Sequence, residues 1–464
     1  MRILRRNWKF LLLGVFVAVA SCSFTTKQFN DPSKDKLLID LISYVLDRGH
    51  YDPKELDDEF SQNVWRNFIE SLDPLKRYFL SQDLEEFEIY RSLLDDQIRE
   101  KNLVFFDLVY QRYIERSELT KTYYIEILGI PFDYRLDEYI NTDYENLAYA
   151  TSKKALKEHW RKQLKYTALA NYYELIEDQK EARMMHPDSI PSNEIRDLIE
   201  LSYEDLEVKA RETTKSTLDD NYSFTDDLER KDYFAIYLNA IVSVFDPHTN
   251  YFAPPDRDRF DLRMSGKLEG IGARLQKKND YITIVEVISG GPVWRGEHLE
   301  VGDAIIKVKQ QNEDEATSLV GMRVDDAVKL IKGPKGTKVT LTVKRVDGTI
   351  DEEVIERDVV ELAETYAKST IIEKNSKRYG LINLPAFYFD MTDYSERNAA
   401  TDVRKEIDKL KSEEIEGLIM DLRNNGGGSL RTAVDIAGLF IEKGPVVQVA
   451  TNGDRKEVLK DRDS

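Results

Sequence analysis

The chain has 464 residues, of which 41% are hydrophobic and 33% charged, and its formal net charge is −19 at pH 7. A chain of this length is too long for one hydrophobic core, so we expect about three domains. The composition is typical of a globular rather than a disordered protein, and so acidic a surface argues against nucleic acid as a partner.

The first 22 residues have the pattern of an export signal. Basic residues in MRILRRNWKF precede an apolar run from Phe10 to Ala20, which is too short to span a membrane comfortably. The segment Val-Ala-Ser-Cys22 that closes it resembles a bacterial lipobox, whose cysteine is acylated. We therefore expect a lipid anchor on Cys22 that attaches the protein to a membrane without spanning it. An ordinary signal peptide with an incidental cysteine is the alternative.

The chain offers few residues for metal or redox chemistry. Cys22 is the only cysteine, which excludes disulfides and thiolate metal sites. No His-Glu-x-x-His motif occurs, and the histidines are scattered along the chain. We therefore expect neither a metal nor a cofactor. The histidines are His50, His159, His186, His248 and His298.

A helical N-terminal domain is predicted for residues 23–245. From residue 31 onward the sequence is rich in Leu, Glu, Lys, Tyr and Asp and poor in Gly and Pro, which predicts helix almost throughout. Lys231 to Phe245 forms a strongly apolar helix that Asp246-Pro247 closes. In the first helix, Asp35 and Asp40 point away from an apolar stripe at helical spacing. This stripe is Leu37, Leu38, Leu41, Ile42 and Val45.

The pattern changes at Asp246. DPHTNYFAPPD has three prolines in eleven residues, which predicts a non-helical linker over residues 246–263. Alternating apolar residues then predict strands near 281–286 and 339–343. Beyond Val359, a strand at 379–384, a helix at 397–411 and a buried strand at 417–422 predict a mostly parallel or mixed sheet.

Residues 264–357 have the features of a peptide-binding module. Gly270-Ile271-Gly272 predicts a turn whose backbone N–H groups converge on a carboxylate. The strand that starts at Ala273 offers an edge to which an extended peptide can add. A helix at 324–332 places an apolar stripe beside this groove, although half of that stripe belongs to the core. The candidate peptide contacts are Gly270, Ile271, Gly272, Ala273, Val324, Val328 and Ile331.

Together with the turns at Gly290-Gly-Pro and Gly302-Asp303, these motifs resemble a PDZ domain of the type associated with bacterial proteases. Two further segments resemble the tail-specific proteases, also called C-terminal processing peptidases. They are Asp246-Pro-His-Thr-Asn-Tyr-Phe252 and Met420-Asp-Leu-Arg-Asn-Asn-Gly-Gly-Gly-Ser429.

The resemblance covers essentially all of the chain after residue 22. It implies a multidomain fold with an α-helical N-terminal domain, a small β-rich (α+β) PDZ-like domain at 264–357 and the start of an α/β mixed-sheet protease domain at 358–464.

The triple glycine suggests a catalytic use. It brings bare backbone N–H groups to the start of a helix, an arrangement that can supply part of an oxyanion hole in acyl transfer. Gly426 and Gly427 are the candidate donors, and the sequence does not choose between them. A turn required only for tight strand–helix packing is the alternative.

The resemblance also implies a serine nucleophile and a lysine base whose pKa is lowered by burial. In the family both residues follow the glycine turn, in Ser-Ala-Ser-like and Gly-Lys-Gly-like segments, and neither segment occurs before Ser464. We therefore assign no catalytic residue in this chain, place the dyad beyond residue 464 and expect the chain alone to be inactive. We reject Ser429 and Lys456, because Ser429 lies within the turn and Lys456 in a charged segment that predicts a solvated loop.

The family resemblance implies a serine-type endopeptidase that captures unstructured, apolar C-termini of exported proteins. It would be lipid-anchored in the bacterial cell envelope and face the periplasm, and an accessory lipoprotein is a further partner that the resemblance allows. A non-catalytic adaptor that binds C-terminal tails is the alternative. In such an adaptor the strands at 417–422 and 445–449 would keep unpaired edges, which invite aggregation.

Overall fold

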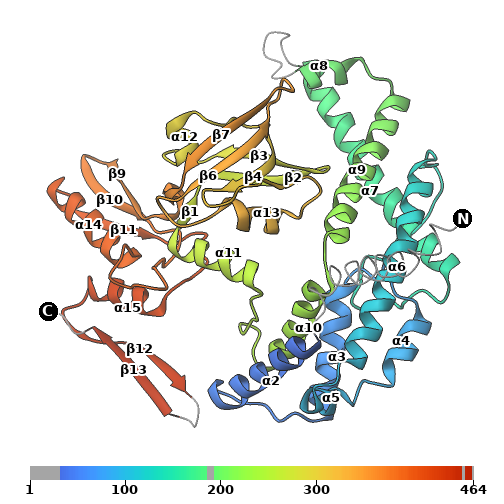
Figure 1. Cartoon of the computed structure of the whole chain (residues 1–464), viewed down its shortest axis with the longest axis horizontal. Helices are drawn as coiled ribbons and strands as arrows, with labels where there is room; N and C mark the ends of the chain where they lie inside the picture. The colour runs from blue at the N-terminus through green and yellow to red at the C-terminus, as the bar shows by residue number, and fades with distance from the viewer. Residues whose placement is uncertain (1–31, 185–192, 452–454, 462–464) are drawn as a thin grey trace, which may run out of the picture. The chain divides into compact units, whose positions relative to one another are not determined.

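The computed structural model describes residues 32–184, 193–451 and 455–461. The chain divides into two compact units, Met1–Tyr251 and Phe252–Ser464. Figure 1 labels the helices and strands of both units. The predicted export signal and the lipid attachment at Cys22 lie outside the described residues.

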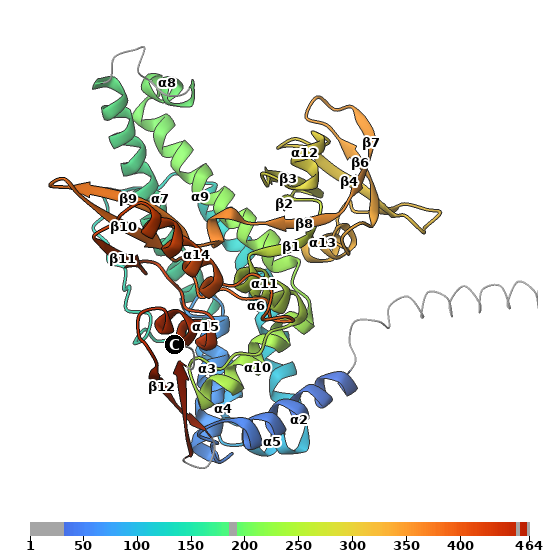
Figure 2. The ribbon, with the colours of Figure 1, turned by 90° about the vertical axis from the view of Figure 1, so that its left-hand side faces the viewer.

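The first unit is built from helices around an aromatic core. Phe68, Phe106 and Tyr237 are fully buried there, and their rings contact one another. Helices α7 and α9 run side by side, and α10 packs on α3 (Figures 1 and 2). The helices are α2 (Pro32–Gly49), α3 (Asp58–Leu72), α4 (Ser81–Glu88), α5 (Leu94–Glu100), α6 (Val104–Leu128), α7 (Lys153–Met184), α8 (Asn193–Glu200), α9 (Tyr203–Asp226) and α10 (Arg230–Phe245).

The prediction of helix almost throughout is confirmed for most of this unit, although residues 129–152 form a long segment without helix. The predicted helix from Lys231 to Phe245 is α10, and it is largely buried, as expected. None of the helices within the described residues is long and apolar enough to cross a membrane.

The buried face predicted for the first helix is only partly correct, since Leu38 and Ile42 pack against the core but the other stripe residues do not. Helix α2 instead buries Ile39 and Leu46, together with Asp35. The reason is tertiary, because Arg230 of α10 donates a hydrogen bond of 2.5 Å to the Asp35 carboxylate and so turns that side of α2 inward. Three residues of the predicted stripe are more than half exposed, namely Leu37, Leu41 and Val45.

The predicted non-helical linker also needs correction. Helix α11 spans Pro254–Ser265, and Pro254 and Pro255 form its first turn. Proline is tolerated there, because the first N–H groups of a helix have no partner within the helix and the fixed φ of proline suits the first turn. The helix ends at Gly266, whose φ of +67° lies in the left-handed region.

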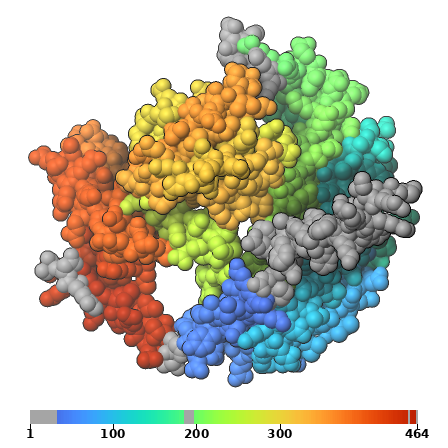
Figure 3. All heavy atoms as spheres, viewed as in Figure 1, coloured from blue at the N-terminus to red at the C-terminus, as the bar shows by residue number. Residues whose placement is uncertain are grey.

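The second unit contains, after α11, an antiparallel sheet in the order β2-β3-β4-β6-β7. Its apolar core includes Ile282, Ile284, Val308 and Leu341. In the space-filling view the segment that encloses this core forms a continuous yellow and light-orange mass (Figure 3). The elements are β2 (Ala273–Lys278), β3 (Tyr281–Val287), α12 (Pro292–Gly296), β4 (Ala304–Gln310), β5 (Thr317–Ser318, paired with β4), α13 (Val324–Ile331), β6 (Lys338–Lys344) and β7 (Ile350–Glu356).

A ribbon of two antiparallel strands, β1 (Lys267–Gly270) and β8 (Asp358–Glu361), flanks this sheet in the sequence. A short 3₁₀ helix (Ala363–Thr365) leads to the next sheet, whose order is β11-β10-β9. Strands β10 and β11 are parallel and β9 is antiparallel, which confirms the predicted mixed sheet. The elements are β9 (Lys368–Lys374), β10 (Lys377–Asn383), α14 (Ala399–Ser412), β11 (Gly417–Asp421) and α15 (Leu430–Gly438).

The end of the unit is a hairpin of β12 (Gly444–Thr451) and β13 (Arg455–Asp461), separate from the β9–β11 sheet (Figure 1). Two predictions fail here. The segment around Lys456 is a strand rather than a loop, because backbone pairing with β12 does not depend on its charged, exposed side chains. The strand at 417–422 is only half-buried, because β11 forms an edge of the sheet within the described residues.

Candidate functional site

The predicted peptide groove lies along strand β2. This strand is the first in the order β2-β3-β4-β6-β7, so one of its edges is not covered by another strand of that sheet. Just before it, the backbone N–H groups of Ile271 and Gly272 have no hydrogen-bond acceptor within the described residues. The carbonyl groups of the same two residues are engaged, by the N–H groups of Val293 at 3.0 Å and Ile288 at 2.9 Å. The turn is therefore fixed on its carbonyl side and leaves donors for an anionic ligand.

The conformation of this turn requires glycine at one position. Gly272 has a φ of +81°, and a Cβ there would lie 2.9 Å from the Cα of Gly291. Gly270, in contrast, is the last residue of β1 and pairs with Asp358 of β8. The turn predicted at 270–272 is therefore made by Ile271 and Gly272, and Gly270 belongs to the ribbon.

Helix α13 packs against β2 with its apolar stripe. Val324 and Val328 are half-buried and keep surface that a ligand can contact. Ala327 is fully buried, and Ile331, a predicted peptide contact, is only 2% exposed within the core. Ile331 is therefore part of the core and not available to a ligand, whereas Val324 and Val328 can still contact one.

The triple-glycine turn lies between β11 and α15 and is held by the backbone of Phe387. The Phe387 N–H donates to the Gly427 carbonyl, and the Ser429 N–H donates to the Phe387 carbonyl, both at 2.9 Å. Gly428 has a φ of +140°, and a Cβ there would collide with the Phe387 carbonyl oxygen. Glycine is therefore required at Gly428 by this close approach of two backbones.

The two candidate oxyanion donors differ in this turn. The Gly427 N–H donates to Oδ1 of Asn425 at 2.8 Å, so it is already engaged. The Gly426 N–H has no acceptor within the described part of the chain, and Gly426 is exposed. The geometry therefore favours Gly426 as the available donor.

Sequence reasoning missed the part played by Asn425. Its side-chain amide also donates to the Leu384 carbonyl at 2.9 Å, so Asn425 ties the turn to the residue that follows β10. Asparagine before glycine is a turn signal, and this pair was the available hint.

The rejected pair, Ser429 and Lys456, occupies two different elements. Ser429 is the N-cap of α15, and its Oγ accepts a hydrogen bond of 3.2 Å from the Thr432 N–H. Lys456 is exposed on the hairpin strand β13. Lys456 therefore lacks the burial that a lysine general base requires.

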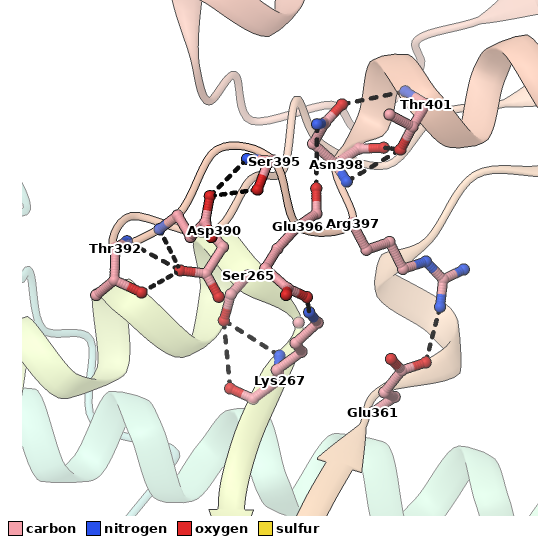
Figure 4. A network of polar contacts seen from close by, with 12 residues as sticks. Ser265, Lys267, Glu361, Asp390, Thr392, Ser395, Glu396, Arg397, Asn398 and Thr401 are labelled. Atoms are coloured by element: carbon pink, nitrogen blue, oxygen red, sulfur yellow. Dashed lines mark hydrogen bonds and ion pairs between the residues drawn. The ribbon is translucent and has the colours of Figure 1, made fainter.

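A polar network ties the β1–β8 ribbon to the start of helix α14 (Figure 4). Arg397 donates to Glu361 of β8 at 2.7 Å and to the buried carboxylate of Asp402 at 2.6 Å. The Tyr388 hydroxyl donates to the same carboxylate at 2.7 Å. At the other strand, Lys267 of β1 lies 3.4 Å from Glu396. The ribbon next to the peptide groove is thus anchored to the α/β region by charged side chains.

Three family models match the sequence in chain order. The tail-specific protease N-terminal domain matches residues 42–255, the PDZ domain residues 260–344 and peptidase family S41 residues 378–464. A tail-specific protease of Haemophilus influenzae is 32% identical over 424 residues, which is 90% of this chain. The chain belongs to the tail-specific protease family.

The predicted multidomain fold is confirmed by these matches and by the structure, while the exact domain boundaries stay predictions. The chain spans 55% of the Haemophilus protein. The carboxy-terminal processing protease CtpA of Bacillus subtilis is 35% identical over 254 residues, which is 54% of this chain and 49% of that protein. The chain thus spans about half the length of these relatives.

Among solved structures, the chain is similar to the PDZ domain of a carboxy-terminal protease from Vibrio cholerae in complex with peptide. The identity is 45% with a TM-score of 0.20, and the match covers 21% of this chain and 99% of that one. Within the described residues no group of three or more His, Cys, Asp or Glu side chains forms a potential metal site.

Proposed function

We propose that this chain belongs to a serine-type endopeptidase that captures apolar C-terminal tails and cuts the attached protein. One observation carries the tail-binding part: the N–H groups of Ile271 and Gly272, which have no acceptor in the described part of the chain, lie at the start of edge strand β2, beside α13. A peptide that pairs with β2 places its terminal carboxylate on these N–H groups and its last side chain against Val324 and Val328.

The catalytic part of the proposal rests on the glycine turn and the family. The Gly426 N–H is the proposed oxyanion donor, and the start of helix α15 adds its positive end. The Ser-Lys dyad is proposed to lie outside residues 1–464. We further propose that the protein is anchored through Cys22 in the bacterial envelope, faces the periplasm, acts on exported proteins and works with an accessory lipoprotein.

Tail recognition is tested by binding of two fluorescent peptides to the purified chain. Both end in Val-Ala, one as the free acid and one as the amide. We expect the acid to bind at least about tenfold more tightly, because only the acid offers a charged acceptor to the two N–H groups. Equal affinity for both peptides would contradict the proposal.

A pair of variants locates the binding site on α13. Val328→Asp places a charge in the groove, whereas Lys329→Asp places one on the neighbouring exposed position. We expect the first variant to lose at least about tenfold in affinity for the acid peptide and the second to bind like the wild type. Similar losses in both variants would place the peptide elsewhere.

The catalytic part has its own test. The reading frame beyond codon 464 is sequenced, and the complete product is assayed for cleavage of an unfolded protein with a Val-Ala terminus. Ser-Ala-Ser-like and Gly-Lys-Gly-like segments with cleavage activity would support the endopeptidase. Their absence, with tail binding intact, would favour a non-catalytic adaptor.

A further inference from the structure

Arg357 is a buried arginine at the junction between β7 and β8. It is only 3% exposed. Its guanidinium donates to the Ile331 carbonyl at 2.8 Å, to the Leu330 carbonyl at 3.1 Å, to Gln310 Oε1 at 2.7 Å and to Thr337 Oγ1 at 3.0 Å. The first two acceptors are carbonyl groups at the C-terminal end of α13, so Arg357 caps the groove helix where its dipole is negative.

The four hydrogen-bond acceptors that the described residues offer this guanidinium are neutral. Within the described residues no carboxylate forms an ion pair with Arg357, and burial lowers the pKa of Arg357 from its ordinary value. The carboxylate of the next residue, Asp358, forms ion pairs with Arg295 at 2.7 Å and Lys335 at 3.0 Å instead. Arginine stays protonated at neutral pH, so an uncompensated positive charge remains buried here.

Two close approaches link the segment beside this guanidinium to the turn of Ile271 and Gly272. A Cβ on Gly333 would lie 2.9 Å from the Arg357 Cζ, and a Cβ on Gly270 would lie 3.9 Å from the Cα of Lys332, the residue before Gly333. In the ribbon, Gly270 is also the register partner of Asp358. Gly270 directly precedes the N–H groups of Ile271 and Gly272. Lys332 therefore links the two places. It lies beside Gly270, which precedes the turn, and the residue after it, Gly333, lies beside the guanidinium.

We propose that Arg357 is a positioning residue of the peptide groove. It fixes the C-terminal end of α13 beside β2 and supplies the positive charge that makes the Ile271–Gly272 turn prefer a carboxylate to an amide. A buried cation without an acidic partner gains the most from an approaching anion, and a neutral amide offers no such gain. The inference rests on the proposed function, because it presumes that this turn binds peptide C-termini.

The test measures the ratio of the affinities for acid and amide peptides in three variants of the whole chain. Arg357→Met removes the charge, Arg357→Lys keeps it, and Lys338→Met removes an exposed charge from β6, which is not adjacent to β2. We expect the acid-to-amide ratio to fall at least about fivefold in Arg357→Met. It should stay within about twofold of the wild-type ratio in Arg357→Lys and Lys338→Met. Hydrogen exchange of the β2–β7 amides reports whether each variant is folded.

The outcomes separate this inference from the proposed function. A wild-type protein without preference for the acid contradicts the proposed function itself. With that preference present, a folded Arg357→Met that keeps the wild-type ratio overturns the role of Arg357. If acid and amide binding weaken equally in both Arg357 variants, the arginine is merely structural and the inference is again overturned. Should Arg357→Met fail to fold, loss of the ratio in a folded Arg357→Lys would also refute the inference.

Discussion

Arg397 donates a 2.7 Å hydrogen bond to the carboxylate of Glu361, and this bond joins the loop before α14 to strand β8 (Figure 4). The guanidinium also lies over the Tyr366 ring, 3.5 Å from its centroid. Arg397 and Glu361 are 36 positions apart in the sequence. The contact fixes the ribbon through which the chain enters and leaves the groove domain.

Substitution of Arg397 should destabilise this anchoring. Arg397→Gln removes the ion pairs to Glu361 and Asp402, and the side chain of Asp402 is only 7% exposed. We expect a loss of about 1–3 kcal/mol in the free energy of opening of α14, because a buried carboxylate loses its charged donor. Native-state hydrogen exchange of the α14 amides measures it. The control is Arg378→Gln, whose arginine has similar exposure and pairs with surface Glu413, and its loss should stay below about 1 kcal/mol. Equal losses in the two variants would show that the contacts of Arg397 stabilise α14 no more than a surface ion pair does.

Two glycines with the same φ separate backbone strain from crowding in the peptide turn. Gly272 and Gly290 have φ of +81° and +80°, but only a Cβ at Gly272 would meet other atoms. We expect Gly290→Ala to cost about 1 kcal/mol through strain alone. Gly272→Ala should cost about 2–4 kcal/mol, because Gly291 must also move. Unfolding in urea, monitored through hydrogen exchange of the β3 amides, measures the cost of each substitution. Similar costs would indicate that the Gly272–Gly291 approach relaxes without penalty.

The glycine turn permits the same kind of comparison. A Cβ at Gly428 would collide with the Phe387 carbonyl, whereas a Cβ at Gly426 would meet open space, and the φ of Gly426 is not in the left-handed region. Gly428→Ala should therefore break the Ser429–Phe387 hydrogen bond and speed exchange of the Ser429 amide at least about tenfold. In Gly426→Ala that rate should change by less than about threefold. Unchanged exchange in Gly428→Ala would show that Phe387 does not hold the turn.

The lowered pKa of Asp358 predicts that the protein loses stability in acid. Hydrogen bonds and ion pairs with Lys335 and Arg295 lower the pKa of Asp358 to about 2, from an ordinary value of 3.8. A lowered pKa means that the folded state favours the carboxylate, so the stabilisation is present above pH 3.8 and is lost as the pH falls through about 2. The difference in unfolding midpoint between the wild type and Asp358→Asn should therefore shrink steadily between pH 4 and 2. A difference that stays constant over this range would contradict the assignment.

Local sequence patterns predicted several elements well. The alternation of apolar residues gave strands β3 and β6, and the spacing of Val324, Ala327 and Val328 gave helix α13. The mixed sheet followed from the strand–helix–strand order around α14. These predictions hold because periodicity and chain connectivity are properties of the segment itself.

The failures share a different cause. The buried face of α2 depends on Arg230, which is 195 residues from its partner Asp35. Residues 455–461 form a strand because they pair with β12. Ile331 is buried in the core rather than exposed beside β2 because of the way α13 packs on the sheet. Helix α11 differs from the prediction for a local reason, since its two prolines stand in the first turn, where proline is tolerated.

The sequence by itself determined the order of the domains and the positions of the turn before β2 and of the glycine turn before α15, because glycine patterns and periodicity act within a few residues. Tertiary structure alone decided that the Gly427 N–H is engaged by Asn425, which leaves Gly426 as the available donor. It also decided that Arg357 is buried with no acidic partner among the residues that the structure describes. A hydrogen bond or an unpaired charge depends on which distant atoms the fold brings within about 3 Å, and no local pattern records that.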